Sequence, residues 1–310
     1  MDHIDFETTR LQSTLDLQKV DFADFFKGLT RPCEMDEWRR VRRQRSSGIR
    51  RSALKRRLFA MAGKGLKRTE DYVRTYYARW ARSQLREADP FNDPAFRPVT
   101  WRGEHISASP WATNRVSLLR LARLIEVARP AHVLEVGTGN GLYPLLLSCA
   151  FPDVKFCGIE LTAEGVAAAA DFQYLETLPE PLLRFLPLPV RDPTAFRRVV
   201  IEQGSARSLP YQDASFDLVF TCLALEQMEV IRKQALSEIA RVAKRWASFI
   251  EPFGDVNTKG LQRAYIYGMN YFRGRSSDLP RYGLRPLLLS SDFPQVFYMN
   301  IAHVVAVRTQ

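Results

Sequence analysis

Apolar residues follow two different spacings along the chain, and the change falls near position 100. Beyond it, short apolar runs alternate with longer segments in which apolar residues recur every three or four positions. The runs are typical of strands buried on both faces, and the longer segments are typical of amphipathic helices. Strands are expected at 132–136, 155–160, 197–203, 216–220 and 246–253, and helices at 109–128, 142–149, 161–176 and 229–244. This alternation predicts an α/β fold, a Rossmann-like, mostly parallel sheet with helices on both faces.

The first 109 residues follow a helical pattern instead. Helices are expected at about 49–62 and 69–87, and the Asp- and Pro-rich stretch 89–94 is typical of a linker. We therefore expect a helical N-terminal region, 1–109, and a second domain, 110–310. Two segments interrupt the second domain as insertions, a Pro-rich one at 177–196 and an aromatic and basic one at 254–285.

Charge is distributed very unevenly over the 310 residues. Residues 39–86 hold 17 Lys and Arg against two Asp and Glu, a balance of +15, while the whole chain carries +11. Such a segment suits an anionic partner, either RNA, a phosphorylated substrate or a membrane surface. A solvated helical face would give the same pattern, and charge alone does not separate these alternatives.

Composition excludes several other classes of protein. The longest apolar stretches, such as 142–151, fall short of the roughly 20 residues of a transmembrane helix. The acidic N-terminus lacks the features of a secretory signal, and the four cysteines form no CxxC pair. We expect a cytoplasmic protein with no transmembrane segment and no metal site.

A glycine-rich loop follows the first strand of the second domain. Gly137, Gly139 and Gly141 alternate there and precede a predicted helix, whose free N–H groups would point at a ligand. Glu160 ends the next strand, where a carboxylate can accept hydrogen bonds from a ribose diol. The pattern predicts a nucleotide-like cofactor at this edge of the sheet. A dinucleotide loop would need a third glycine at 142, but that residue is Leu142.

The stretch from Glu135 to Gly141, acidic-x-Gly-x-Gly-x-Gly, resembles the first motif of the class I S-adenosylmethionine-dependent methyltransferases, in particular the methyltransferase type 11-like domain. Later segments match that family in the same order: 204–219, 223–228 and 250–252. The end of the chain, 294–308, resembles the antiparallel strands that close the family's sheet. The resemblance covers about 110–310 and implies S-adenosyl-L-methionine as the cofactor.

The resemblance also implies roles for individual residues. The loop residues would surround the methionine half of the cofactor, Glu135 would face its amino group, and Glu160 would hold the ribose. The remaining implied contacts are Gly137, Thr138, Gly139 and Gly141 in the loop, Leu161, Ser205 and Ala206 around the adenine, and Cys222 and Leu223 near the sulfonium. The chain departs from the family at Ser205, where many members carry Asp, and at Gln227, where many carry His.

Methyl transfer requires a base only when the accepting atom is poorly ionised, such as a hydroxyl. Glu226 is the candidate catalytic base, since it follows the fourth strand at the carboxyl edge of the sheet. The function predicted is methyl transfer to a hydroxyl or amine of a small-molecule or saccharide-type acceptor. Two alternatives stay open: an RNA methyltransferase that uses 39–86 to hold phosphate, and a non-catalytic protein that keeps the cofactor fold and docks on an anionic surface.

Overall fold

A seven-stranded sheet forms the centre of the molecule in the computed structural model, which describes residues 3–17, 20–63, 67–81 and 87–309. Its strand order is β6-β5-β4-β7-β8-β10-β9, and the first five strands pair in parallel. The strands are β4 (His132–Val136), β5 (Lys155–Glu160), β6 (Val200–Gln203), β7 (Phe216–Cys222), β8 (Ala243–Glu251), β9 (Leu284–Ser290) and β10 (Ala302–Arg308). The predicted α/β fold and Rossmann-like parallel sheet are confirmed.

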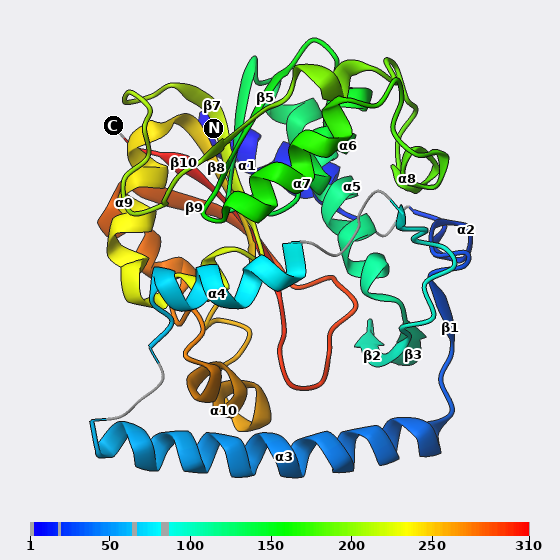
Figure 1. The fold of residues 1–310 in the computed structure, drawn as a ribbon, viewed down its shortest axis with the longest axis vertical. Coiled ribbons are helices and arrows are strands. Elements are labelled where there is room, and N and C mark those ends of the chain that lie inside the picture. Colours follow the sequence, from blue (N-terminus) through cyan, green and yellow to red (C-terminus); the bar gives the residue numbers. More distant parts are fainter. Residues whose placement is uncertain (1–2, 18–19, 64–66, 82–86, 310) are drawn as a thin grey trace.

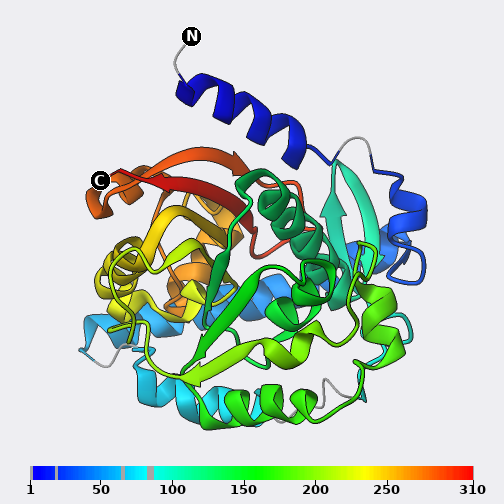
Figure 2. The same cartoon turned by 90° about the horizontal axis from the view of Figure 1, so that it is seen from above.

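Each face of the sheet has its own apolar core, as expected when both faces are covered. Val133 and Leu218 point into one core, while the adjacent Leu134 and Val219 point into the other. The first core is packed mainly by α5 (Pro110–Ala128), α6 (Leu142–Ala150), α7 (Ala163–Gln173) and α8 (Glu180–Phe185), and the second by α9 (Arg232–Val242). Figure 2 shows the sheet between these layers.

The helix before the first central strand begins as its sequence predicts. Ser109 is its N-cap and accepts a hydrogen bond from Trp111 N–H, and Pro110 occupies the first turn. Pro fits there because the first N–H groups of a helix have no partner within it. The helix buries ten of its residues and packs against α1 and α6.

The N-terminal region surrounds the sheet instead of forming a separate layer (Figure 1). The helix α1 (His3–Leu15) contacts α5, and the short α2 (Phe22–Phe25) precedes a three-stranded sheet of β1 (Thr30–Pro32), β3 (Glu104–Ala108) and β2 (Arg97–Trp101). The long helix α3 (Met35–Met61) lies along one side of the molecule, and α4 (Glu70–Ala81) crosses the carboxyl edge of the central sheet. The expected helix at 49–62 is thus the second half of a longer one. Of the helix expected at 69–87, residues 82–86 lie outside the described residues.

The closing antiparallel pair differs from its prediction. Its strands are β9 and β10, whereas the pattern at 294–308 had indicated that the pair lay within that stretch. Residues 291–301 form a loop, which is tied to β2 by Gln295, whose backbone exchanges two hydrogen bonds with Thr100. Apolar side chains alternate in this loop although it adds no strand to the central sheet, so alternation alone misidentified it as a strand. Between β8 and β9 lie α10 (Gly260–Met269) and a 3₁₀ segment (Ser276–Tyr282).

Membrane-spanning helices are not found among the described residues, where no helix has both the length and the apolarity needed to cross a bilayer.

Candidate active site

The glycine loop turns sharply between β4 and α6. Gly137, Gly139 and Gly141 have φ of +78°, +59° and +80°, a region that other residues adopt only at a cost. The N–H groups of Gly137 and Thr138 both donate to the carbonyl of Ile159 on β5, at 2.8 and 3.1 Å. The loop is thereby held at the switch point of the sheet, where ligands bind in such folds.

Glu160 fastens the loop to the end of β5. Its Oε2 accepts the N–H of Gly139 at 2.9 Å, and its Oε1 accepts both the N–H and the hydroxyl of Thr162. A carboxylate offers about four acceptor positions, so these three bonds leave capacity for a ligand hydroxyl. The side chain is 8% exposed and lines the cavity described below.

Glu135 is a buried carboxyl group with a single hydrogen bond among the described residues, from the Thr138 hydroxyl at 2.6 Å. Burial raises the pKa of Glu135 to about 8. In the part of the chain that the structure describes, no basic side chain forms an ion pair with it. Because a buried carboxyl without a cation is costly to ionise, this position is complementary to a positively charged ligand.

A tight turn after β7 supplies the opposite wall of the site. Leu223 has φ of +52°, and its N–H donates to the Ile250 carbonyl at 2.9 Å. The buried Glu251, at the end of β8, then accepts the N–H groups of the next three residues, 224–226. Burial also raises the pKa of Glu251 to about 8. Backbone strain of this kind persists only where surrounding contacts enforce it, and these four hydrogen bonds do so.

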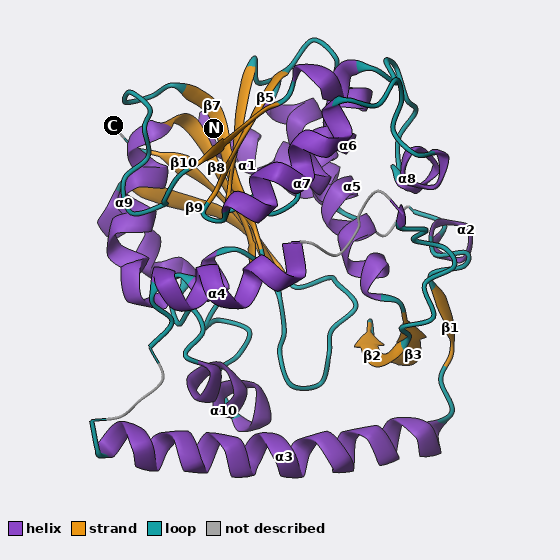
Figure 3. Cartoon of the chain, viewed as in Figure 1, coloured by secondary structure: helices purple, strands orange, loops and turns teal. Residues whose placement is uncertain are grey.

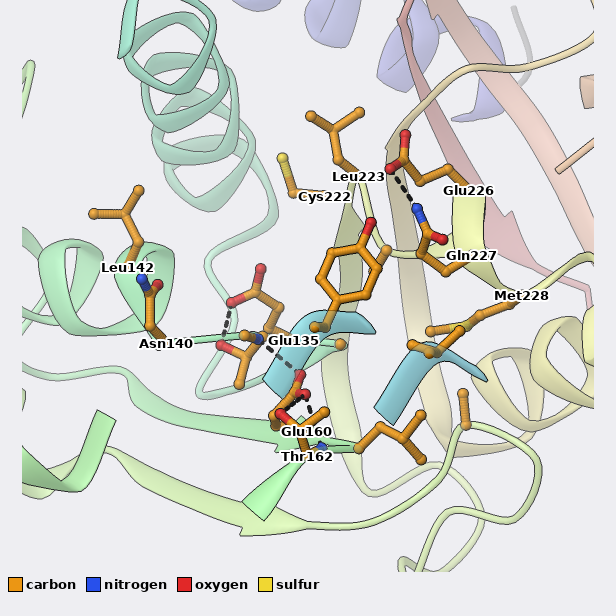
Figure 4. A pocket seen from close by; sticks show the side chains of 18 of the residues that line it. Glu135, Asn140, Leu142, Glu160, Thr162, Cys222, Leu223, Glu226, Gln227 and Met228 are labelled. Carbon is orange, nitrogen blue, oxygen red and sulfur yellow. Dashed lines mark hydrogen bonds between the residues drawn. The ribbon is translucent and has the colours of Figure 1, made fainter. Parts of the chain in front are cut away.

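Glu226 stands on that turn and faces the cavity (Figure 4). It is 9% exposed, and burial raises its pKa to about 7. Its Oε1 accepts from the Gln227 amide at 2.6 Å, and the amide oxygen of Gln227 accepts from the Arg68 guanidinium, also at 2.6 Å. Tyr77 and Tyr271 line the same cavity, and burial followed by the charge of Glu226 raises the pKa of both.

These walls enclose one cavity of about 670 Å³, within the range of small-molecule and cofactor sites. Most of the residues predicted from the sequence line it. The structure brings together there Glu135, Gly137, Thr138, Gly139, Glu160, Leu161, Ala206, Cys222, Leu223 and Glu226. Figure 4 shows Glu135 and Glu160 on one side and Glu226 on the other, with Cys222 and Leu223 on the wall that connects them.

Gly141 and Ser205 do not line the cavity. Gly141 is the N-cap of α6, and a Cβ there would lie 2.8 Å from Cδ1 of Ile201, so its place is one of tight packing. The Ser205 hydroxyl donates to Glu70 of α4, which also pairs with Arg207 at 3.2 Å. Glu70 itself lines the cavity, so α4 brings a carboxylate to the place where many family members carry Asp.

Sequence reasoning missed the contribution of α4 and its neighbours. Arg68 is 2% exposed; its Nε donates to the Met269 carbonyl, and its guanidinium lies 4.4 Å from the ring centre of Tyr271. Arg74 donates to the carbonyl of Leu161. Both belong to the segment whose charge indicated a polyanion partner, yet Arg68 lines the cavity and Arg74 binds the backbone of Leu161, which lines it. Arg68 is separated from Gln227 by 159 positions, and no local pattern signals such a pair.

Metal ligation has no candidate in the described residues, where no cluster of three or more His, Cys, Asp or Glu has the arrangement of an ion site.

Comparison with solved structures defines the class of fold. Magnesium protoporphyrin IX methyltransferase from Synechocystis PCC 6803 superposes with a TM-score of 0.51 at 13% identity, over 77% of this chain and 99% of that one. The cyclase SpnF superposes with a TM-score of 0.50 at 17% identity, over 78% of this chain and 97% of the other. The chain thus has the fold of the class I S-adenosylmethionine-dependent methyltransferases.

Sequence comparison identifies the family of the central segment. Residues 134–250 match the family model described as a methyltransferase domain. The chain is 31% identical over 128 residues to 27-O-demethylrifamycin SV methyltransferase of Amycolatopsis mediterranei, covering 40% of each chain. It is 31% identical over 126 residues to demethylmenaquinone methyltransferase of Lactiplantibacillus plantarum, covering 41% of this chain and 46% of the relative. A tRNA1(Val) (adenine(37)-N6)-methyltransferase of Vibrio parahaemolyticus matches over 64 residues at 36% identity, 21% of this chain and 26% of that one.

The chain therefore contains a class I S-adenosylmethionine-dependent methyltransferase domain, with S-adenosylmethionine as the cofactor of that class, as its motifs predicted. It spans less than half the length of the two 31% identical relatives. These relatives act on acceptors of different kinds, so the comparisons leave the acceptor open.

Proposed function

We propose that this protein transfers the methyl group of S-adenosylmethionine to a hydroxyl or amine of a small-molecule or saccharide-type acceptor. The observation that carries the proposal is the position of Glu226, a buried carboxyl with a pKa of about 7 that shares one cavity with the glycine loop. A base of that pKa is suited to remove a proton from an acceptor near neutral pH.

The residues of the cavity fit the cofactor. Glu160 suits the ribose, the glycine loop suits the methionine half, and the buried carboxyl of Glu135 suits the ammonium group of that half. When bound, the cofactor supplies an already activated methyl group, so the protein has chiefly to position the acceptor and exclude water.

The acceptor end of the cavity lies around Glu226. Oε1 of Glu226 is occupied by the Gln227 amide, which leaves Oε2 to take a proton from the acceptor. Tyr77 and Tyr271 make this end aromatic, and Arg68 holds Gln227 in place while stacking on Tyr271. Because α4 covers the cavity, the end suits a compact group more than the middle of a polymer.

A binding and activity experiment tests the proposal. Titration calorimetry with S-adenosylmethionine and S-adenosylhomocysteine should show binding that Gly139→Arg abolishes. Transfer of labelled methyl into fractionated cell extract should then place label among small molecules or saccharides. Glu226→Gln should lower transfer by about 10²- to 10⁴-fold and leave cofactor binding intact, while Glu126→Gln, an exposed carboxyl on α5, should change neither.

The second candidate is an RNA methyltransferase, favoured by the exposed arginines of α3 and by the tRNA-modifying relative. Label in the RNA fraction would support it and contradict the first proposal. A third candidate keeps the fold without methyl transfer, as the neighbour named as a cyclase illustrates. Tight cofactor binding with no label in any fraction would support that candidate.

A further inference from the structure

The helix α3 has one face fixed to the molecule and one face free (Figure 3). It crosses α10 closely, since a Cβ added at Gly268 would lie 3.3 Å from the Cα of Ala53. Arg56 donates to the Gly268 carbonyl at 2.6 Å, and Arg45 donates to the Tyr298 hydroxyl at 2.9 Å. These contacts determine which side of α3 faces outward.

The outward face carries an aliphatic stripe over its last two turns. Leu54, Leu58 and Met61 are 61%, 58% and 78% exposed. They stand at positions i, i+4 and i+7, so they line one side of the helix. Isolated exposed apolar residues need no explanation, but three on the same side of one helix form an exposed apolar strip.

Exposed arginines flank this stripe. The helix holds ten Lys and Arg against two Asp and Glu, and Arg50, Arg51 and Arg57 stand beside the aliphatic residues with their side chains exposed. An interfacial helix has this composition, with cations on its polar side and aliphatic residues on the other.

A groove between α3 and α10 extends the same surface. It has a volume of about 700 Å³ and is lined by Leu54 of the stripe and by four arginines, Arg56, Arg57, Arg263 and Arg273. Tyr267, 52% exposed, lies under two of these cations, at 5.3 Å from Arg263 and 4.8 Å from Arg273. Guanidinium groups around an open groove are well suited to phosphate oxygens.

We propose that this α3–α10 face binds the surface of an anionic lipid bilayer. Headgroup phosphates would occupy the arginine groove, and Leu54, Leu58 and Met61 would enter the boundary between headgroups and acyl chains. Anionic lipid complements the charge, and the acyl boundary gives the aliphatic stripe an apolar environment. RNA would use the arginines and the exposed Tyr267, because single strands are held by phosphate contacts and aromatic stacking, but the aliphatic stripe would stay in water.

The α3–α10 face is connected to the cavity through the end of α10. Arg56 binds the Gly268 carbonyl from the docking side, and Arg68 binds the next carbonyl, that of Met269, from the cavity side. A membrane on this face would therefore lie next to the acceptor end of the site. The proposal does not depend on methyl transfer, since lipid binding is measured without it.

Sedimentation with vesicles tests the proposal on the full chain. Vesicles of phosphatidylcholine alone should bind weakly, and vesicles with about 30 mol% phosphatidylglycerol should bind in a salt-sensitive manner. Replacing Arg50, Arg51 and Arg57 by Gln removes three cations from the docking surface. This should weaken vesicle binding on the order of a hundredfold, since each loss of about 1.4 kcal/mol in binding free energy is a tenfold change in affinity. Replacing Leu54, Leu58 and Met61 by Ser, which leaves every charge in place, should weaken it at least about tenfold.

A matched control removes the same charge elsewhere. Lys155→Gln, Arg197→Gln and Lys233→Gln together remove three exposed cations from other elements and should leave vesicle binding within about twofold. Circular dichroism checks that each variant keeps its helix content. The proposal is overturned if anionic vesicles do not bind, if the serine variant binds like the parent, or if a labelled single-stranded RNA binds while vesicles do not.

Discussion

Three buried carboxyl groups have raised pKa values: Glu135 and Glu226, which line the cavity, at about 8 and 7, and Glu251, which holds the β7 turn, at about 8. Burial is the first cause in each; the charges of Glu160 and Glu251 further raise the pKa of Glu135, and the charge of Glu226 further raises that of Glu251. Such a cluster is expensive to ionise without a cation nearby. The site thus has an electrostatic preference for a positively charged ligand, which a glycine motif alone does not imply.

Cofactor affinity should therefore depend on pH through Glu135. Below pH of about 8 this carboxyl is largely protonated, and a bound ammonium group favours its ionised form, so binding releases a proton. We expect the affinity for S-adenosylmethionine to rise between about pH 6 and pH 8, by at most about tenfold per pH unit. Calorimetry on the parent and on Glu135→Gln measures this, because the variant loses the titration of Glu135 and keeps those of Glu226, Glu251 and the ligand. Parallel profiles for the two proteins would contradict the assignment.

The same raised pKa makes the stability of the ligand-free protein fall as pH rises, whereas cofactor affinity increases. The folded state holds a proton that the unfolded chain loses near pH 4.5, so the folded state binds more protons between the two values. The contribution to stability is fully present below about pH 4.5 and is lost as pH rises through about 8. Urea titrations of the parent should thus show a decline over this range that is smaller in Glu135→Gln.

Gly137 offers a test of the close contact between the glycine loop and the turn after β7. A Cβ there would lie 2.6 Å from the Cβ of Ala224, and its φ is +78°. Gly137→Ala should cost about 1–3 kcal/mol of unfolding free energy and weaken cofactor binding, because the β7 turn must shift. Gly103 is the matched control, with φ of +87° and no atom within 4 Å of an added Cβ. Gly103→Ala should show backbone strain without loss of cofactor binding, and equal binding losses would indicate a general effect of strain.

Residues adjacent in sequence to a motif could be predicted, whereas partners distant in sequence could not. Glu135 and Glu160 lie at the carboxyl ends of β4 and β5, and Glu226 follows β7, so the parallel sheet brings them to one edge. Glu251 is also at a strand end, but its role depends on three N–H groups of the β7 turn. These groups are distant in sequence and meet Glu251 only in the folded chain. In the sequence Arg68 is one of many cations in 39–86, and only the structure shows that it is buried against Tyr271.

At the scale of elements, α4 covers the cofactor cavity, and polar side chains tie it to the segments that follow β5 and β6. Glu70 accepts from the Ser205 hydroxyl and pairs with Arg207, while Arg74 donates to the Leu161 carbonyl. These ties lie beside the position that the resemblance implies for adenine. We therefore predict that α4 opens during cofactor exchange.

Weakening this tie should speed cofactor exchange. Glu70→Ala removes both contacts of that carboxylate, and a loss of about 1.5 kcal/mol corresponds to a release rate on the order of tenfold higher. Stopped-flow fluorescence of cofactor release measures the rate. Asp71→Ala, at the neighbouring exposed position of α4, is the control and should behave like the parent. An unchanged rate in Glu70→Ala would show that α4 does not gate exchange.

Element prediction succeeded where local pattern and tertiary packing agree. The strands at 132–136 and 155–160 were predicted with their observed bounds, because both are short, apolar and followed by turns. The last pair was misplaced because β9 carries Leu287, Leu288 and Leu289 in sequence, which hides a period of two, whereas the loop after it alternates. The first half of α3 was missed because its arginines gave no apolar period.

The whole molecule shares one of its cores between the N-terminal region and the methyltransferase domain. Leu11, Leu15 and Leu17 are 0–2% exposed and belong to the same apolar cluster as Val116 and Leu121 of α5. The linker at 89–94 and the change of apolar spacing had indicated a boundary near 109, but neither reveals which apolar residues are shared across it. Cooperative unfolding is expected when one core spans both parts.

Truncating one leucine inside the shared core and one outside it tests that cooperativity. Leu11 is 0% exposed in the shared core, while Leu54 is 61% exposed on α3. Leu11→Ala should cost about 2–5 kcal/mol of unfolding free energy, since the cavity it leaves lies against α5. Leu54→Ala should stay within about 0.5 kcal/mol. Urea unfolding followed by fluorescence and by circular dichroism should give one coincident transition in each variant. If Leu11→Ala instead produced an early transition that left cofactor binding intact, the N-terminal region would be a separate folding unit, and the shared core would contribute nothing to the stability of the site.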